Sequence, residues 1–285
     1  MFYLIQLLNA VQYGLLLFLL SSGLTLIFGI MGVINLAHGS FYMVGAYLAF
    51  WLAKSTGSLW LALPLTLLIA FVIGLLLETA IVSRLYRRDH LYQVLLTFGL
   101  ILIFEELRSI FFGDDVHGVA VPALLNFSIA LTETLSYPVY RLFVTLVCLI
   151  IAALMYFVIH RTRVGMRIRA GNSNREMAAS LGVNMPLLFA LVFASGVALA
   201  AFAGAIAAPI SSVFPGMGNQ ILILCFVVVV IGGIGSINGA LLASLAVGVA
   251  DTLGKVIAAE YSAIAVYLVM ATILLWRPQG IANRA

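Results

Sequence analysis

The sequence predicts an all-α integral membrane protein, a polytopic bundle of roughly eight to ten transmembrane helices. Of its 285 residues, 64% are hydrophobic and only 8% are charged, and the mean hydropathy is +1.20. Soluble domains are about 45–50% apolar and about 25% charged, so lipid must surround most of this chain. A span needs about 20 apolar residues, which leaves no room for a second, water-soluble domain, and residues 1–285 are expected to form one transmembrane domain.

Nine apolar runs account for these spans. The first begins at the N-terminus, which lacks the basic region and cleavage site of a signal peptide and is therefore expected to remain as a span. A turn containing Gly29, Gly32 and Asn35 separates it from the second. The predicted spans cover about residues 4–30, 36–53, 60–82, 91–112, 140–160, 187–208, 219–232, 239–256 and 261–276.

The positions of lysine and arginine predict the orientation, because these residues accumulate in cytoplasmic loops. Ten of the 14 follow the third run, the fifth run or the last run: Arg84, Arg87, Arg88, Arg161, Arg163, Arg167, Arg169, Arg175, Arg277 and Arg284. With nine spans, the N-terminus is then outside and the C-terminus in the cytoplasm. The external segment 113–139 contains Pro122 and Pro138 and is expected to form a short cap over the bundle.

The cytoplasmic segment 161–186 is predicted to hold a short helix at about 174–182. Asn174 or Ser173 suits its N-cap, Glu176 in the first turn suits the helix dipole, and Gly182 can end it. Small residues would let another protein approach closely: Ala178, Ala179 and Ser180. The alternative is a well-capped connector between two spans, and the residues alone do not decide between the two.

Two glycine-rich breaks interrupt the apolar runs. Lipid cannot satisfy the backbone groups that a break frees, so each must face protein or a water-filled path, and transporters use broken helices at substrate sites. Gly-Ser-Ile-Asn at 235–238 echoes Gly-Val-Ile-Asn at 32–35, which predicts that the breaks meet near the cytoplasmic end of the path if the echo is a structural repeat. The alternative is a pair of tight turns with packing glycines. The candidate path residues are Gly32, Asn35, His38, Gly232, Gly235 and Asn238.

Charged residues inside apolar runs are further candidates, because charge in lipid is costly. Glu105 and Arg108 have the i,i+3 spacing of an ion pair. Glu78 and Asp251 have no such near partner, and Asp251 either pairs across helices or lines the path. The two cysteines, Cys148 and Cys225, are predicted to be buried small side chains, neither metal ligands nor a disulfide.

Several motifs resemble one known family. Gly-Val-Ile-Asn-Leu-Ala-His-Gly at 32–39 resembles the first signature of the branched-chain amino acid permeases of bacterial ATP-binding-cassette importers, in particular their LivH-type subunits, and 227–240 resembles their C-terminal signature. Glu176, Ala178 and Gly182 resemble the Glu-Ala-Ala loop of importer permeases, although Met177 stands where its first alanine would be. In that family this loop is the coupling helix, which implies an ATPase contact through Asn174, Arg175, Glu176, Ala178, Ala179 and Gly182.

The resemblance also implies the partners and the location. They are ATPase subunits that bind ATP and Mg, a second homologous permease chain, a periplasmic substrate-binding protein, and the bacterial inner membrane. This chain itself is expected to be non-catalytic, to hold no cofactor and to bind no nucleic acid. Leucine, isoleucine and valine are the implied substrates, although close relatives carry urea, short amides or other amino acids.

Two other classes of function compete with this interpretation. A secondary, ion-coupled transporter would also use broken helices and buried charge, but it would need no ATPase-docking helix. An intramembrane enzyme would need a paired nucleophile and base or a metal set, and His38 and Ser40 alone form no such group. The sequence contains no Gly-x-x-x-x-Gly-Lys-[Ser/Thr] loop, so ATP-driven import requires a separate ATPase.

Overall fold

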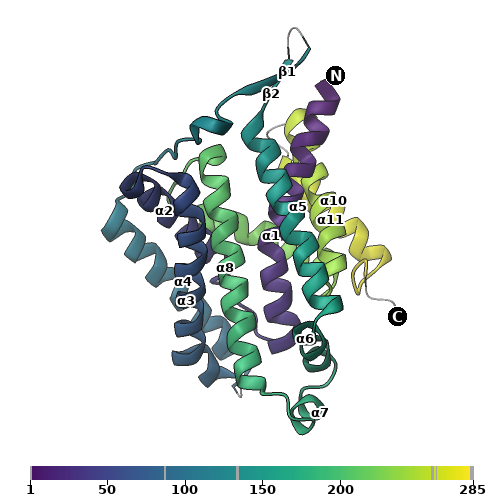
Figure 1. The fold of residues 1–285 in the computed structure, drawn as a ribbon. Helices are drawn as coiled ribbons and strands as arrows, with labels where there is room; N and C mark the ends of the chain where they lie inside the picture. Colours follow the sequence, from purple (N-terminus) through teal and green to yellow (C-terminus); the bar gives the residue numbers. More distant parts are fainter. Residues whose placement is uncertain (1, 87, 133–134, 258–259, 261, 283–285) are drawn as a thin grey trace.

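A computed structural model describes residues 2–86, 88–132, 135–257, 260 and 262–282. The chain is a helical bundle with a small hairpin (Figure 1). The long helices are α1 (Phe2–Met31), α2 (His38–Thr56), α3 (Leu59–Ala80), α4 (His90–Phe112), α5 (Val139–Arg161), α8 (Met185–Ser211), α9 (Met217–Gly232), α10 (Ile237–Ile257) and α11 (Ser262–Trp276). The shorter elements are η1 (Val82–Leu85), η2 (Ala123–Leu125), β1 (Ser128–Thr132), β2 (Leu135–Pro138), α6 (Arg163–Ser173) and α7 (Arg175–Ser180).

Each of the nine predicted apolar runs coincides with one long helix, so the predicted fold class is confirmed. Five of these helices, α1, α3, α5, α8 and α10, are long and apolar enough to cross a membrane. At 1.5 Å per residue, the 16 residues of α9 extend only about 24 Å, which is less than the roughly 30 Å of a bilayer core. The first residues of α9, Met217 and Gly218, are buried, and Gly218 packs against Gly39 of α2, so the helix begins inside the bundle.

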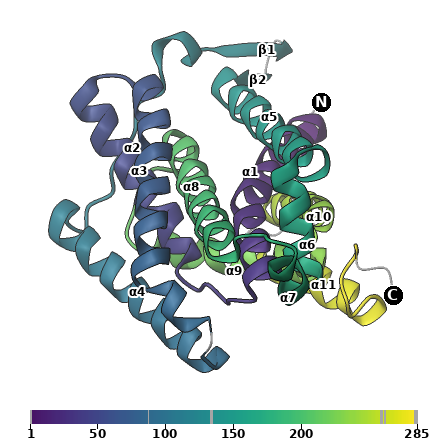
Figure 2. The ribbon, with the colours of Figure 1, turned by 60° about the horizontal axis from the view of Figure 1, so that its bottom comes forward.

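The core of the bundle lies where α1, α2, α8, α9 and α10 pack together, while α4 and α11 lie at opposite margins (Figure 2). Small residues let these central helices approach closely. A methyl group on Gly23 of α1 would lie 2.7 Å from the carbonyl oxygen of Gly196 on α8, so the two backbones touch there. The side chains of Leu17, Leu20 and Ile27 on α1 are fully buried.

The segment between α4 and α5 crosses one end of the bundle and then forms the hairpin (Figure 1). The backbone groups of His117 and Val213 exchange two hydrogen bonds of 2.8 Å, which tie this segment to the connection between α8 and α9. Beyond this point, β1 and β2 pair antiparallel with Ser128 opposite Pro138, and the hairpin projects away from the helices. The predicted cap is thus only part of this segment, and the hairpin was not predicted.

The connections that carry most of the arginines lie at the end of the bundle opposite to the N-terminus of α1 (Figure 1). The aromatic ring of Tyr86, between α3 and α4, packs against Phe189 with 5.1 Å between ring centres. Arg175 of α7 lies over the same Phe189 ring at 5.9 Å, so both connections meet at this end. We call it the arginine-rich end. Two residues of the predicted topology, Arg87 and Arg284, lie outside the described residues.

Candidate translocation path and coupling segment

The short helix α7 lies at the far tip of the arginine-rich end, with the caps that its sequence predicts (Figure 1). The Asn174 side chain accepts a hydrogen bond of 2.9 Å from the backbone N–H of Met177. After the helix, Gly182 adopts a left-handed φ of +84°, and the N–H groups of Gly182 and Val183 donate to the carbonyls of Ala179 and Ala178. This is the Schellman pattern of a helix C-terminus, so the sequence fixes both ends of the helix.

The exposed face of α7 differs from the predicted one. Ala178 is only 3% exposed and packs inward, so it cannot touch another protein directly as expected, because the helix turns this side toward the bundle. Met177 and Leu181 are 59% and 77% exposed instead. Two large apolar side chains at the tip of a polar loop, outside the spanning helices, form a surface suited to a protein partner.

The helix α6, which joins α5 to α7, was not predicted. The Thr162 side chain caps it by accepting a hydrogen bond of 3.2 Å from the N–H of Gly165. Gly165 leaves no room for a side chain, because α6 folds back against the backbone at the end of α5, and Arg169 donates to the carbonyl of Ile159 there. The segment before α7 is therefore a capped helix packed against the end of α5.

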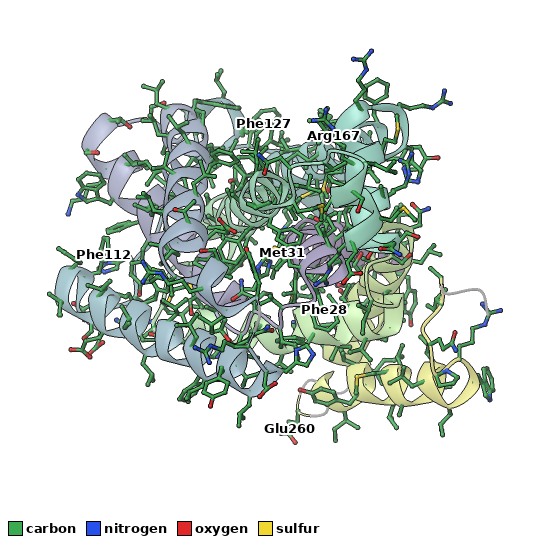
Figure 3. All side chains as sticks on the ribbon, turned by 90° about the horizontal axis from the view of Figure 1, so that it is seen from below. Phe28, Met31, Phe112, Phe127, Arg167 and Glu260 are labelled. Carbon is green, nitrogen blue, oxygen red and sulfur yellow. The ribbon has the colours of Figure 1, made fainter. Side chains whose placement is uncertain are left out.

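The two glycine-rich breaks lie side by side at the arginine-rich end. The helix α1 ends at Met31 and α9 ends at Gly232, and Gly32 and Gly235 have φ values of +62° and +77°. A methyl group on Gly29 would lie 2.7 Å from the Cα atom of Gly235, so the backbones at the two breaks are in contact. In the view from this end, Met31 lies in the middle of the bundle (Figure 3).

The segment α6–α7 touches both breaks. The Asn172 side chain lies 3.5 Å from where methyl groups on Gly29 and Gly235 would stand. The Nη2 atom of Arg175 lies 2.8 Å from the corresponding point on Gly32, at the C-terminus of α1, where a positive charge suits the helix dipole. A cavity of about 40 Å³ lies at this junction of α1, α6 and α10, large enough for about one water molecule.

Asn35 and His38 are fully buried within the protein, not exposed to a path. The ring Nε2 of His38 lies 2.9 Å from the carbonyl oxygen of Leu20, and Asn35 accepts a hydrogen bond of 3.1 Å from the N–H of Ala37. Within the described part of the chain, the Nδ1 of His38 and the Nδ2 of Asn35 have no hydrogen-bond partner. A buried polar group left without any partner would cost about 1–3 kcal/mol, so both atoms are suited to bond to water or a ligand at this break.

The helices α2 and α9 begin at this depth inside the bundle. Leu20, which meets His38, lies in the middle of α1, and Gly39 of α2 packs against the backbone of Gly218 near the start of α9. Two helix N-termini therefore converge beside the buried break. Broken helices with this arrangement line substrate paths in transporters.

The candidate path residues Gly232 and Asn238 do not lie at the buried break beside Asn35 and His38. Gly232 packs against α10, since a methyl group there would lie 2.7 Å from the backbone nitrogen of Ala240. Its role in this structure is close helix packing, the alternative considered above. Asn238 is exposed at the start of α10, whereas Asn35 is buried, so the two Gly-x-Ile-Asn strings do not occupy equivalent surroundings.

Most charges within the spans have partners. Arg108 pairs with Glu105 at 3.3 Å, as predicted, and with Asp114 at 3.0 Å. Glu78 is 2% exposed and accepts a hydrogen bond from the hydroxyl of Tyr86. Burial and this carboxylate raise the pKa of the Tyr86 hydroxyl.

The expectation that Asp251 lacks a near partner is wrong. Its carboxylate pairs with the ammonium of Lys255, one turn further along α10, at 2.6 Å. The helix α10 continues through Lys255 to Ile257, so both members of the pair lie on one helix. Cys148 and Cys225 are free and buried, in α5 and α9.

Comparison with known proteins identifies the class. A family model described as "Branched-chain amino acid transport system / permease component" matches residues 6–275. The chain therefore belongs to this family of membrane-embedded permease components. No solved structure matches it.

Individual relatives are similar to this chain over almost all of its length. It is 31% identical to the high-affinity branched-chain amino acid transport system permease protein BraD of Pseudomonas aeruginosa, across 99% of this chain and 96% of the relative. It is 28% identical to the protein LivH of Escherichia coli, across 100% of this chain and 96% of the relative. LivM of the same organism is 29% identical, over 92% of this chain but 67% of its own length.

Proposed function

We propose that this chain is the LivH-type permease subunit of an ATP-driven importer for leucine, isoleucine and valine in the bacterial inner membrane. It pairs with a second, homologous permease, and a periplasmic binding protein delivers the amino acid. Separate ATPase subunits bind ATP and Mg and supply the energy, so this chain catalyses no reaction. The N-terminus lies outside and the arginine-rich end faces the cytoplasm, because lysine and arginine accumulate there.

The contact between the α6–α7 segment and both breaks carries this proposal. An ATPase that docks on Met177, Leu181 and the neighbouring Glu176 would push against α7. The push reaches Gly32 through the Arg175 side chain and reaches Gly29 and Gly235 through Asn172. A short chain of packed side chains thus joins the ATPase surface to the ends of α1 and α9.

The unpaired groups of Asn35 and His38 favour a second conformation. In the described structure they are buried without partners, and movement of the break would let them meet water or substrate. The break between α1 and α2 would then act as the gate of the path.

A reconstituted complex tests this function. The chain, the second permease and the two ATPase subunits are placed in proteoliposomes with leucine-loaded binding protein, and ATP hydrolysis and leucine uptake are both measured. We expect ATP-dependent uptake and hydrolysis stimulated by the loaded binding protein. Uptake driven by an ion gradient without ATP would support the secondary transporter instead, and urea or a short amide that stimulates hydrolysis better than leucine would correct the substrate.

A further inference from the structure

A cavity of about 370 Å³ with several polar side chains in its lining lies at the outer end of the bundle, between α1, α5, α8 and α10, with Tyr42 of α2 at its wall. The volume falls in the range of small-molecule sites, about 300–1,000 Å³. Its polar lining includes residues of both signs of charge among neutral amides and a phenol: Asn9, Gln12, Tyr13, Arg141, Asp251 and Lys255. So much polarity within apolar helices is expensive and marks a functional site by default.

Arg141 is the positive group on one side of the cavity. Its Nη1 donates a hydrogen bond of 2.7 Å to the amide oxygen of Asn9 on α1. Among the described residues, no carboxylate lies within ion-pair distance of this guanidinium. A half-buried arginine held only by a neutral amide retains donors for a carboxylate, which guanidinium binds in a bidentate manner.

Asp251 is the negative group, contributed by α10. It is 7% exposed, and its partner Lys255 is the much more exposed member of the pair. The Lys255 ammonium also lies 5.3 Å from the centre of the Tyr13 ring. The Lys255 side chain is 57% exposed, so a second ammonium that displaced it from Asp251 would leave the lysine facing water.

Apolar side chains complete the lining. Leu16 of α1, Ala207 and Ile210 of α8, and Val256 of α10 face the same cavity. An aliphatic side chain would be sheltered from water among them.

We propose that this cavity receives the amino acid as a zwitterion, with the α-carboxylate at Arg141, the α-ammonium at Asp251 and the aliphatic side chain against Leu16 and Ala207. This proposal rests on the proposed import of branched aliphatic amino acids. It goes further by naming the place where the permease itself binds them. It lies on the outer half of α1, whereas the two breaks lie at the other end of the same helix. Substrate released by the binding protein is held here before the break opens.

The test measures leucine imported per ATP hydrolysed in the reconstituted complex. We expect Arg141→Gln and Asp251→Asn to lower this ratio by about tenfold, since hydrogen bonds to charged groups are strong, while hydrolysis stimulated by loaded binding protein stays near the unaltered level. Arg141→Lys keeps the positive charge but loses the two parallel N–H donors of the guanidinium. The ratio of leucine imported per ATP should therefore lie between those of the unaltered complex and Arg141→Gln. Lys54→Gln removes an outer-end cation that lines a different cavity and should change nothing.

A charge exchange separates binding from helix stability. Asp251→Lys combined with Lys255→Asp keeps an i,i+4 pair on α10 but moves the carboxylate one turn. We expect this variant to fold, with an unchanged melting temperature of the complex, and to import poorly. Normal import per ATP in the exchange variant, or in both Arg141→Gln and Asp251→Asn, would overturn the site while leaving the importer function intact. An unaltered complex with neither uptake nor stimulated hydrolysis would overturn both.

Discussion

The left-handed glycine at the end of α7 offers a controlled test of the coupling role. Gly182 has φ +84° and Gly57, at the other end of the bundle, has φ +69°. A Cβ atom added at either position meets nothing within 4 Å. A non-glycine residue in this conformation costs about 1–2 kcal/mol, so alanine at either position should destabilise its own helix terminus by a similar amount.

The two glycines share the left-handed backbone and the open space around an added Cβ, and only Gly182 lies at the proposed ATPase surface. Gly182→Ala adds strain alone, whereas Gly182→Val adds greater strain and bulk on the surface where the ATPase would dock. We expect Gly57→Ala and Gly57→Val to keep most uptake and stimulated hydrolysis. Gly182→Ala should reduce both, and Gly182→Val should abolish both although the chain still inserts.

The assay compares the four variants for membrane abundance, co-purification of ATPase subunits, stimulated ATP hydrolysis and leucine uptake. Equal losses at Gly57 and Gly182 would show that the effect comes from backbone strain. Unchanged hydrolysis and ATPase binding in both Gly182 variants would refute the coupling role of α7.

Three further predictions use the same complex. Cysteine placed at Ser136 should react with a membrane-impermeant reagent in intact cells, and cysteine at Ser173 only after permeabilisation; labelling of the latter from outside would reverse the topology. Gly32→Leu and Gly235→Leu should block uptake while ATPase subunits still co-purify, and normal uptake by both would leave these residues as packing glycines. Glu176→Lys costs only about 0.3–1 kcal/mol at the helix N-terminus but reverses a charge at the proposed docking surface, so stimulated hydrolysis should be lost, and its full retention would exclude Glu176 from the contact.

Local patterns predicted the spans and the caps of α7 well. A long apolar run indicates a span by itself, and cap residues such as Asn174 and Gly182 bond to backbone groups only a few residues away. Both signals can therefore be read from the local sequence, and the helices lie where these signals predict them. The helix α6 was missed because it is polar and lies among five arginines, although Thr162 followed by Gly165 gives it an N-cap.

Contacts between segments far apart in the sequence could not be predicted from local sequence patterns. The inward turn of Ala178 depends on how α7 packs against the bundle, and the junction of Arg175 with Gly32 joins segments more than 140 residues apart. The sequence predicted that the two breaks meet only if the echo between them is a structural repeat; their backbones are in contact, although Asn35 and Asn238 lie in different surroundings.

The cavity at Arg141 and Asp251 has no local signature in the sequence. The pair between Asp251 and Lys255 did have a local signature, the i,i+4 spacing on one helix, and the prediction missed it.

Cross-linking at the tip of α7 shows whether the ATPase docks on this helix. Met177→Cys places a thiol on the exposed face of α7. Val116→Cys places a thiol at the opposite end of the bundle, where the Val116 residue is 65% exposed. The native cysteines are both buried, so a bifunctional thiol reagent reports mainly on the introduced ones. We predict that Met177→Cys cross-links to an ATPase subunit, with a yield that changes when ATP is added, and that Val116→Cys does not. An ATPase adduct at residue 116, or none at residue 177 in a complex that transports leucine, would contradict the account.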